Sequence, residues 1–171
     1  NFDGKVFNPQ KCTHGFGYSI LESETDYLSH EITEYVALED PVKIYFMTLK
    51  NKKKNKLTTN VEFWINPTLG DYEEKTSRNI LSEFVKKDNC LKMRNTYNND
   101  YSDINVFITS SEEITTVELD KMLIKNVNFD LTLASNQEKQ IVFILGCSPS
   151  DRENLELIRK YSNIETCKKE L

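Results

Sequence analysis

Two stretches of the chain alternate strictly between apolar and polar side chains. Over residues 57–65 an apolar or β-branched set alternates with a polar set that includes Trp64, and residues 127–134 repeat the pattern. In an extended strand, neighbouring side chains point to opposite faces, so a period of two is typical of a strand that buries one face. The pattern predicts two half-buried strands.

Apolar runs next to these stretches predict their pairing partners. Residues 42–49 are nearly all apolar or β-branched, and the basic segment 50–56 joins them to the first alternating stretch. Residues 135–139 join the second alternating stretch to the apolar run 141–145. Both connections have the length and polarity of hairpin turns, so each is expected to join two antiparallel neighbours.

Weaker strand patterns bring the expected total to about eight strands. They lie at residues 15–21, 31–36, 104–109 and 115–119. Strands and hairpin turns without a strand-helix-strand rhythm favour stacked antiparallel sheets over a parallel core. The expected fold is mainly β, an antiparallel β-sandwich. No linker or repeat divides the chain, so residues 1–171 are expected to form a single domain.

Two segments change to the helical period. Between residues 76 and 87 the apolar positions fall on one stripe, which predicts an α-helix inserted between strands. Ser150 followed by Glu153 forms a capping box and predicts a C-terminal α-helix. A second such pair, Ser162 with Glu165, predicts that this helix breaks and restarts.

The four cysteines indicate disulfide bonds. None of them forms the Cys-x-x-Cys pair of a zinc or redox motif, and their number is even. They are Cys12, Cys90, Cys147 and Cys167. We expect a disulfide-stapled domain with Cys147 joined to Cys167 and Cys12 to Cys90, although four cysteines permit other pairings. Disulfides predict a secreted or cell-surface protein.

The two ends of the chain bear on its location. A start at Asn1 rather than Met predicts a removed signal peptide or an excised piece of a longer chain. Residues 168–171, Lys-Lys-Glu-Leu, resemble ER retrieval signals, so the alternative is an accessory protein of the ER lumen. An ordinary helix end is the commoner explanation for such a tetrapeptide. Abundant Asn, Lys and Ile with scarce Ala are typical of AT-rich genomes, including those of parasites and viruses.

Composition excludes several classes of function. A formal net charge of −5 argues against a nucleic-acid partner, because such proteins need a basic surface. No apolar stretch approaches the roughly 18 residues of a membrane span. The scattered glycines form no phosphate-binding loop, and no acidic run has calcium-loop spacing, so we expect no cofactor and no metal.

The sequence offers little support for catalysis. His14 and His30 are the only histidines, and neither lies in a recognisable catalytic motif. We therefore expect a protein that is not an enzyme. The remaining enzymatic alternative is a hydrolase or carbohydrate-processing enzyme with scattered carboxylates, which requires a pocket holding two acids of raised pKa.

Three places are candidates for binding a protein partner. Trp64 falls on the polar face of its strand and requires a cover, either the predicted helix over 76–87 or a partner. The lysine-rich loop can meet an acidic partner, a glycosaminoglycan or anionic lipid headgroups, or it can be a solubilising turn. The tyrosines near residue 100 can form an adaptable binding loop or an idle one. The residues are Lys52, Lys53, Lys54, Tyr97 and Tyr101. The predicted function is a secreted or cell-surface adhesion or host-interaction module from a parasite or virus, of unspecified oligomeric state.

Overall fold

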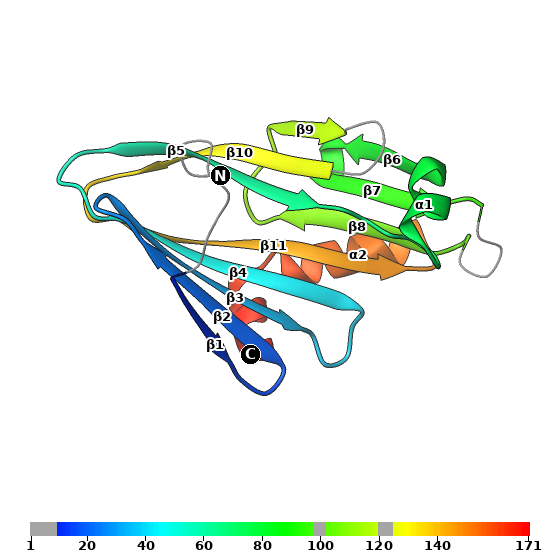
Figure 1. Ribbon diagram of the computed structural model, residues 1–171, viewed down its shortest axis with the longest axis horizontal. Helices are drawn as coiled ribbons and strands as arrows, with labels where there is room; N and C mark the ends of the chain where they lie inside the picture. Colours follow the sequence, from blue (N-terminus) through cyan, green and yellow to red (C-terminus); the bar gives the residue numbers. More distant parts are fainter. Residues whose placement is uncertain (1–9, 98–101, 120–124) are drawn as a thin grey trace.

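Two antiparallel sheets lie one on the other (Figure 1). The computed structural model describes residues 10–97, 102–119 and 125–171. The large sheet has the order β1-β2-β3-β4-β11-β8-β7-β6, and the small sheet has the order β5-β10-β9. The mainly β antiparallel sandwich predicted from the sequence is confirmed, with eleven strands in the described residues.

The strands of the large sheet are β1 (Lys11–His14), β2 (Tyr18–Glu24), β3 (Leu28–Val36), β4 (Val42–Asn51), β6 (Ile80–Val85), β7 (Cys90–Asn95), β8 (Asn105–Ser110) and β11 (Glu138–Ser148). Those of the small sheet are β5 (Leu57–Ile65), β9 (Thr116–Leu119) and β10 (Lys125–Leu133). The helices are α1 (Glu73–Thr76), α2 (Asp151–Tyr161) and α3 (Ile164–Glu170), with short 3-10 turns at Ser77–Asn79 and Lys86–Asp88. None of these described helices has the length and hydropathy needed to cross a membrane.

One hydrophobic core fills the space between the two sheets. The inward residues of the alternating strands, among them Val61 and Phe129, meet those of the large sheet. Phe143 of β11 lies at the centre, with its ring 4.9 Å from that of Phe63 and 5.7 Å from that of Phe129. The apolar half of the period-two pattern therefore does what the sequence predicts: it buries one face of the small sheet.

A second core lies on the other face of the large sheet, under α2 and α3 (Figure 1). Ile158, Tyr161 and Cys167 from the helices pack there against the strands, including Ile44 and Val142. β11 is thus buried on both faces, and residues 141–144 are completely inaccessible. A strand covered on both sides needs apolar residues at every position, which explains its continuous apolar run.

Polar contacts fix the C-terminal helices on this face. The Tyr161 hydroxyl donates to Asp40 at 2.8 Å, and the Lys160 ammonium lies 2.7 Å from the same carboxylate. These two donors hold the pKa of the Asp40 carboxyl below its usual value. The Tyr35 hydroxyl on β3 donates to the main-chain oxygen of Cys167. The helices are therefore attached to the sheet at two places by groups that are distant in sequence.

The helix boundaries agree with one of the two predicted capping boxes. Ser150 accepts a hydrogen bond from the Glu153 amide at 3.2 Å, and α2 begins there. At the restart, Asn163 caps α3 by accepting from the Glu165 amide at 2.9 Å, in place of the expected Ser162. Ser162 still has helical backbone angles and ends α2, whereas Asn163 is the first extended residue.

The inserted helix predicted over 76–87 is wrong for most of its length. α1 is a single turn that ends at Thr76, and the apolar stripe belongs to strand β6, which pairs with β7. Ile80 and Phe84 pack against the core between the sheets. Residues four apart share a face in a strand as well as in a helix, so their spacing could not separate the two. The hydrogen bonds to β7 make this segment a strand.

The two predicted hairpins are also wrong. β4 pairs with β11 and β5 pairs with β10, so neither connection joins hydrogen-bonded neighbours. Each connection crosses from one sheet to the other at the same end of the sandwich (Figure 1). The four strands were correctly located by their patterns, but a short polar connection is compatible with pairing inside one sheet and with passage between two.

A buried asparagine holds the two crossings together. Asn51 is inaccessible to solvent, and its carboxamide nitrogen donates to the main-chain oxygens of Asn55, Leu133 and Ala134 at 2.8–3.3 Å. Its side-chain oxygen accepts from the Lys53 amide at 2.9 Å. One side chain thus provides hydrogen-bond partners for main-chain groups of both connections. These groups lie beyond the ends of the strands and have no partner on a neighbouring strand.

The disulfide prediction is wrong, since all four cysteines are free thiols. Cys12 lies on β1 and Cys90 on β7, six strand spacings apart and therefore about 29 Å along the sheet. A disulfide requires Cα atoms within roughly 7 Å. Cys167 belongs to the core under the helices, whereas the Cys147 position alternates toward the opposite face of β11. Burial raises the pKa of Cys90 to about 12 and that of Cys167 to about 11.

Replacement of Asn51 tests the crossing. We expect Asn51→Ala to lower the free energy of unfolding by about 2–4 kcal/mol, because it leaves main-chain groups of both connections without a partner. Asn55→Ala, in the same loop but with an exposed side chain, is the matched control and should change it by less than about 0.5 kcal/mol. Urea unfolding of both variants measures the difference. Equal effects would contradict the role assigned to Asn51.

The buried histidine makes stability depend on pH. Burial lowers the pKa of His30 on β3 from 6.5 to about 4, so the unfolded chain binds more protons than the folded chain between these values. Stability should be complete above pH 6.5 and should fall by up to about 3 kcal/mol as the pH drops toward 4. Denaturant unfolding across this range measures it. His30→Gln should flatten the dependence and His14→Gln should preserve it; the reverse result contradicts the assignment.

Candidate functional site

The outer face of the small sheet carries polar side chains around one exposed tryptophan. The period of two that buries Val61 and Val127 sends the alternate residues of the same strands outward. We name this surface the tryptophan face. It consists of Thr58, Asn60, Glu62 and Trp64 on β5, Asn126, Asn128, Asp130 and Thr132 on β10, and Thr116 and Glu118 on β9.

Side chains on this face are paired across the strands. Thr58 lies opposite Thr132, with the two hydroxyl oxygens 3.1 Å apart. Asn60 lies opposite Asp130 and donates to its carboxylate at 3.0 Å. Cross-strand pairs of this kind restrict each other's side-chain conformations. The face is therefore a rigid surface, and the opposite side of the same sheet packs against the hydrophobic core.

Trp64 is held at one end of the face. Its side chain is 46% exposed, and the indole Nε1 donates to a Glu62 carboxylate oxygen at 2.7 Å. Asn126 lies directly opposite on β10 and is 2% exposed, and its side-chain oxygen has no hydrogen-bond partner among the described residues. The expected cover, a helix over 76–87, does not exist because that segment is β6 in the large sheet.

The charge of the face limits what it can bind. Its ionisable members are Glu62, Glu118 and Asp130, and none of its ten residues is a lysine or an arginine. Such a face repels anions. Its aromatic ring, amides, hydroxyls and carboxylates suit a neutral ligand that has an apolar face and a polar rim able to donate and accept hydrogen bonds.

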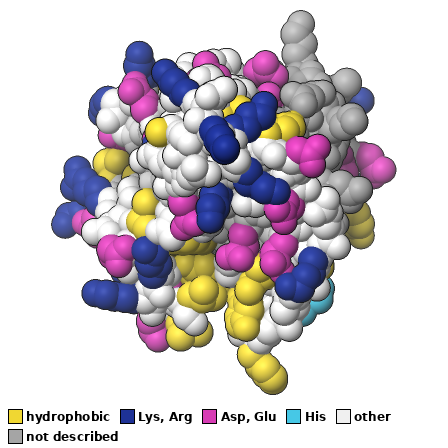
Figure 2. Space-filling model, turned by 90° about the vertical axis from the view of Figure 1, so that its left-hand side faces the viewer, with side chains coloured by type: hydrophobic (Ala, Val, Ile, Leu, Met, Phe, Trp, Pro, Cys, Tyr) yellow, Lys and Arg dark blue, Asp and Glu magenta, His cyan; other side chains and the backbone are white. Residues whose placement is uncertain are grey.

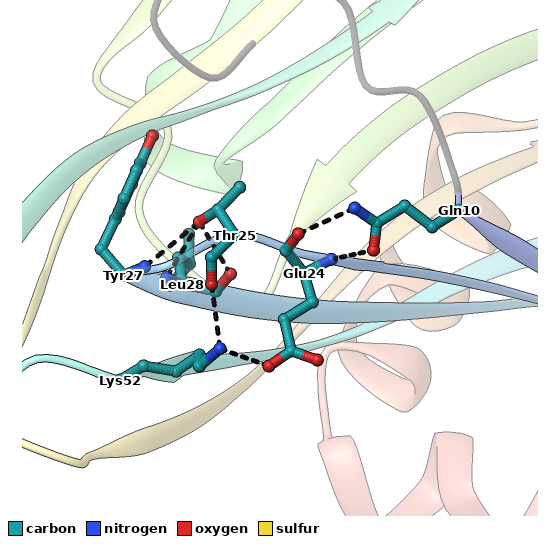
Figure 3. A network of polar contacts seen from close by, with 6 residues as sticks. All are labelled: Gln10, Glu24, Thr25, Tyr27, Leu28 and Lys52. Atoms are coloured by element: carbon teal, nitrogen blue, oxygen red, sulfur yellow. Dashed lines mark hydrogen bonds and ion pairs between the residues drawn. The ribbon is translucent and has the colours of Figure 1, made fainter.

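The loop with Lys52, Lys53 and Lys54 lies at the other end of β5, and two of these lysines contact other parts of the chain. Lys52 forms an ion pair with Glu24 and donates to the main-chain oxygen of Thr25 at 3.0 Å, in a network that also includes Gln10 (Figure 3). The Lys53 ammonium lies 5.0 Å from the centre of the Tyr27 ring. Figure 2, which views this end, shows Lys and Arg side chains interspersed with Asp and Glu.

The predicted binding residues are therefore not gathered in one site. Trp64 and the loop with Lys52, Lys53 and Lys54 are separated by the length of β5, roughly 25 Å. Tyr97 follows β7 and is 74% exposed, and Tyr101 lies outside the described residues. A role of the lysines and Tyr97 in binding stays a prediction.

The hydrolase alternative requires a pair of acids in a hollow of the surface. A groove of about 630 Å³ is lined mainly by apolar residues, including Ile65, Leu69 and Leu145. A polar hollow of about 380 Å³ includes Glu22, Glu24, Glu31 and Glu138, but Lys11 lies 2.5 Å from Glu22. Among the described residues, the carboxyl groups with a displaced pKa are Glu24, Asp40 and Glu165, and in each a lysine lowers the pKa. These features give no support to the hydrolase alternative, which requires raised values.

Comparison with known families decides the class of protein. Residues 6–123 match the family described as the supersandwich domain of glycosyl hydrolase 94. The chain belongs to this family. No curated protein matches it.

Solved structures that are similar to the chain include two kinds of protein. One is a putative kojibiose phosphorylase from the human microbiome, with a TM-score of 0.41, 9% identity, and coverage of 90% of this chain and 20% of that one. Another is the heparan sulfate lyase HepC from Pedobacter heparinus, with a TM-score of 0.48, 13% identity, and coverage of 82% and 21%. The chain spans about a fifth of the length of either protein.

The family overturns the predicted function. A domain of a glycosyl hydrolase family is not an adhesion or host-interaction module, and the disulfides that supported that prediction are absent from the structure. Short motifs could not have found the family, because its match extends over most of the chain. The polar residues Asn128 and Asp130 were visible in the sequence as one strand face, but the wrong hairpin kept them apart from Trp64.

The contact between Trp64 and Glu62 can be tested by fluorescence, because Trp64 is the only tryptophan. We expect Glu62→Ala to lower the emission anisotropy, since the indole loses its acceptor, and to change stability by less than about 0.5 kcal/mol. Glu62→Gln keeps an acceptor and should resemble the wild type. Glu118→Ala on the same face is the control. An unchanged anisotropy in Glu62→Ala would contradict a fixed ring.

Proposed function

We propose that this chain is a non-catalytic supersandwich domain of a carbohydrate-active enzyme and that its tryptophan face contacts a neutral oligosaccharide. The observation that carries the proposal is an exposed tryptophan on a firm polar sheet face, in a domain of a glycosyl hydrolase family. The reaction itself takes place on another part of the enzyme.

The Trp64 ring supplies the apolar half of the contact. A pyranose ring has a face of C–H groups that packs against the negative face of an indole, a contact worth about 1 kcal/mol beyond the buried area. The hydrogen bond from Nε1 to Glu62 fixes the orientation of the indole ring before the sugar binds, which reduces the entropy cost of binding. One ring on an open face supports weak binding, with a Kd on the order of 1 mM.

Amide and carboxylate groups supply the polar half. Sugar hydroxyls donate and accept, so they suit the exposed Asp130 carboxylate on β10 and the half-buried Asn60 and Glu62 side chains on β5, whereas Asn126 and Asn128 are buried. Asn60, Glu62 and Trp64 follow one another along β5 at two-residue intervals of about 7 Å, which extends the contact over more than one sugar unit. The acidic charge of the face excludes sulfated and uronic acid chains.

The contacts of the carboxylates support a role without catalysis. Glycoside hydrolysis uses two carboxyl groups on either side of the scissile bond, one as acid and one as base or nucleophile. Glu62 is engaged by Trp64 and Asp130 by Asn60, so both act as fixed acceptors. A weak sugar-binding face raises the local concentration of the glycan near an active site. A protein partner and a location outside the cell or in the ER lumen stay predictions.

Intrinsic fluorescence tests the proposal directly. Titration with neutral gluco-oligosaccharides should give a saturable change in Trp64 emission, and a heparin oligosaccharide of equal length should give none. By calorimetry, Trp64→Ala should weaken binding at least about tenfold, since it removes the stacking surface. Tyr72→Ala removes an aromatic ring that is exposed elsewhere and should bind as the wild type does.

Two results would contradict this function. One is the absence of saturable binding for every neutral glycan up to about 50 mM, well beyond the expected Kd. The other is equal affinity of Trp64→Ala and wild type, which would place any sugar contact on a different surface.

A further inference from the structure

A cysteine, a histidine and a serine lie in line on one face of the β1–β2 hairpin. The Cys12 sulfur is 3.4 Å from Nε2 of His14, and Nδ1 of His14 is 2.9 Å from the Ser19 hydroxyl. Cys12 and His14 are two residues apart on β1 and therefore share a face, while Ser19 is the cross-strand partner of His14. The register of the hairpin itself brings the three groups together.

The turn that follows His14 holds this register. Gly15 bonds through its amide to the Tyr18 main-chain oxygen at 2.9 Å, and Gly17 has a φ of 80°, which favours glycine. A β-carbon on Gly15 would lie 2.2 Å from the end of the Tyr18 ring, so a larger residue there would require this ring to move. Both glycines therefore serve the geometry that places Ser19 opposite His14.

The order of the three groups suits proton transfer from the thiol. When Nδ1 donates to the Ser19 oxygen, the lone pair of Nε2 faces the Cys12 sulfur. The imidazole can then take the thiol proton, and the thiolate is the form of cysteine that reacts. Ser19 is a positioning residue, since it acts by fixing the ring of His14.

The other cysteines lack this setting. Cys90 and Cys167 are inaccessible, and burial raises the pKa of both thiols. Cys147 is half-buried beside the apolar groove. Cys12 alone is exposed, so the chain carries three internal controls for any thiol chemistry.

We propose that Cys12 and His14 form a thiol–disulfide exchange site whose substrate is a disulfide, either small or in another protein. His14 takes the proton of Cys12, and the thiolate attacks one sulfur of the disulfide. A new bond joins Cys12 to that sulfur, and the other sulfur leaves with the bonding electron pair and takes the proton from His14. Cys12 is oxidised and the leaving sulfur is reduced, so atoms and electrons balance. The site is independent of the tryptophan face.

The test uses dithiodipyridine, an uncharged disulfide, on the folded full chain. One thiol per chain should react in a fast phase, and peptide mass mapping should place it at Cys12. Cys12→Ser should abolish that phase. His14→Gln should slow it about tenfold by removing the proton acceptor, Ser19→Ala should slow it less, and His30→Gln should leave it unchanged.

The pH dependence separates proton transfer from mere exposure. The factor by which the wild-type rate exceeds that of His14→Gln should be larger at about pH 6 than at about pH 8, because the solution holds less hydroxide to take the thiol proton at the lower pH. Circular dichroism confirms that each variant is folded. Equal rates and equal pH profiles for wild type and His14→Gln, or labelling first at another cysteine, would overturn the proposal.

Discussion

The carboxamide of Asn51 is the contact on which the sandwich depends. Two connections pass between the sheets side by side, one from β4 to β5 and one from β10 to β11, and their main-chain groups lose the ladder partners that strands provide. Asn51 supplies donors and an acceptor to both at a point that water does not reach. A strand pair that would otherwise be one hairpin is thereby divided between two sheets, and the space between them becomes the core.

Division into two sheets gives β11 two buried faces and β5 only one. The large sheet carries the small sheet on one side and two helices on the other, so Phe143 and Val142, adjacent in sequence, belong to different cores. The small sheet has no second layer among the described residues, and its outer side keeps the polar half of the alternation. The same period of two therefore produces a core on one side and the tryptophan face on the other.

The composition of the tryptophan face follows from this asymmetry. Trp64 is too large and apolar for an ordinary outward position, and its half-exposed indole donates a hydrogen bond to Glu62. The Cys12–His14 pair, on an edge strand of the large sheet, comes from a different constraint, the register of a tight glycine hairpin.

The sequence by itself determined the class of fold, the burial of one face of the strands over residues 57–65 and 127–133, and the capping of α2 by Ser150, because side-chain periodicity and capping are local properties. It could not determine which strands pair, since a short polar connection serves a hairpin and a crossing equally well. It also placed a helix where β6 lies, because residues four apart share a face in both structures. Only the tertiary structure decided that the cysteines are far apart and that Asn126 lies beside Trp64. These distances depend on strand order, and strand order is decided by non-local packing.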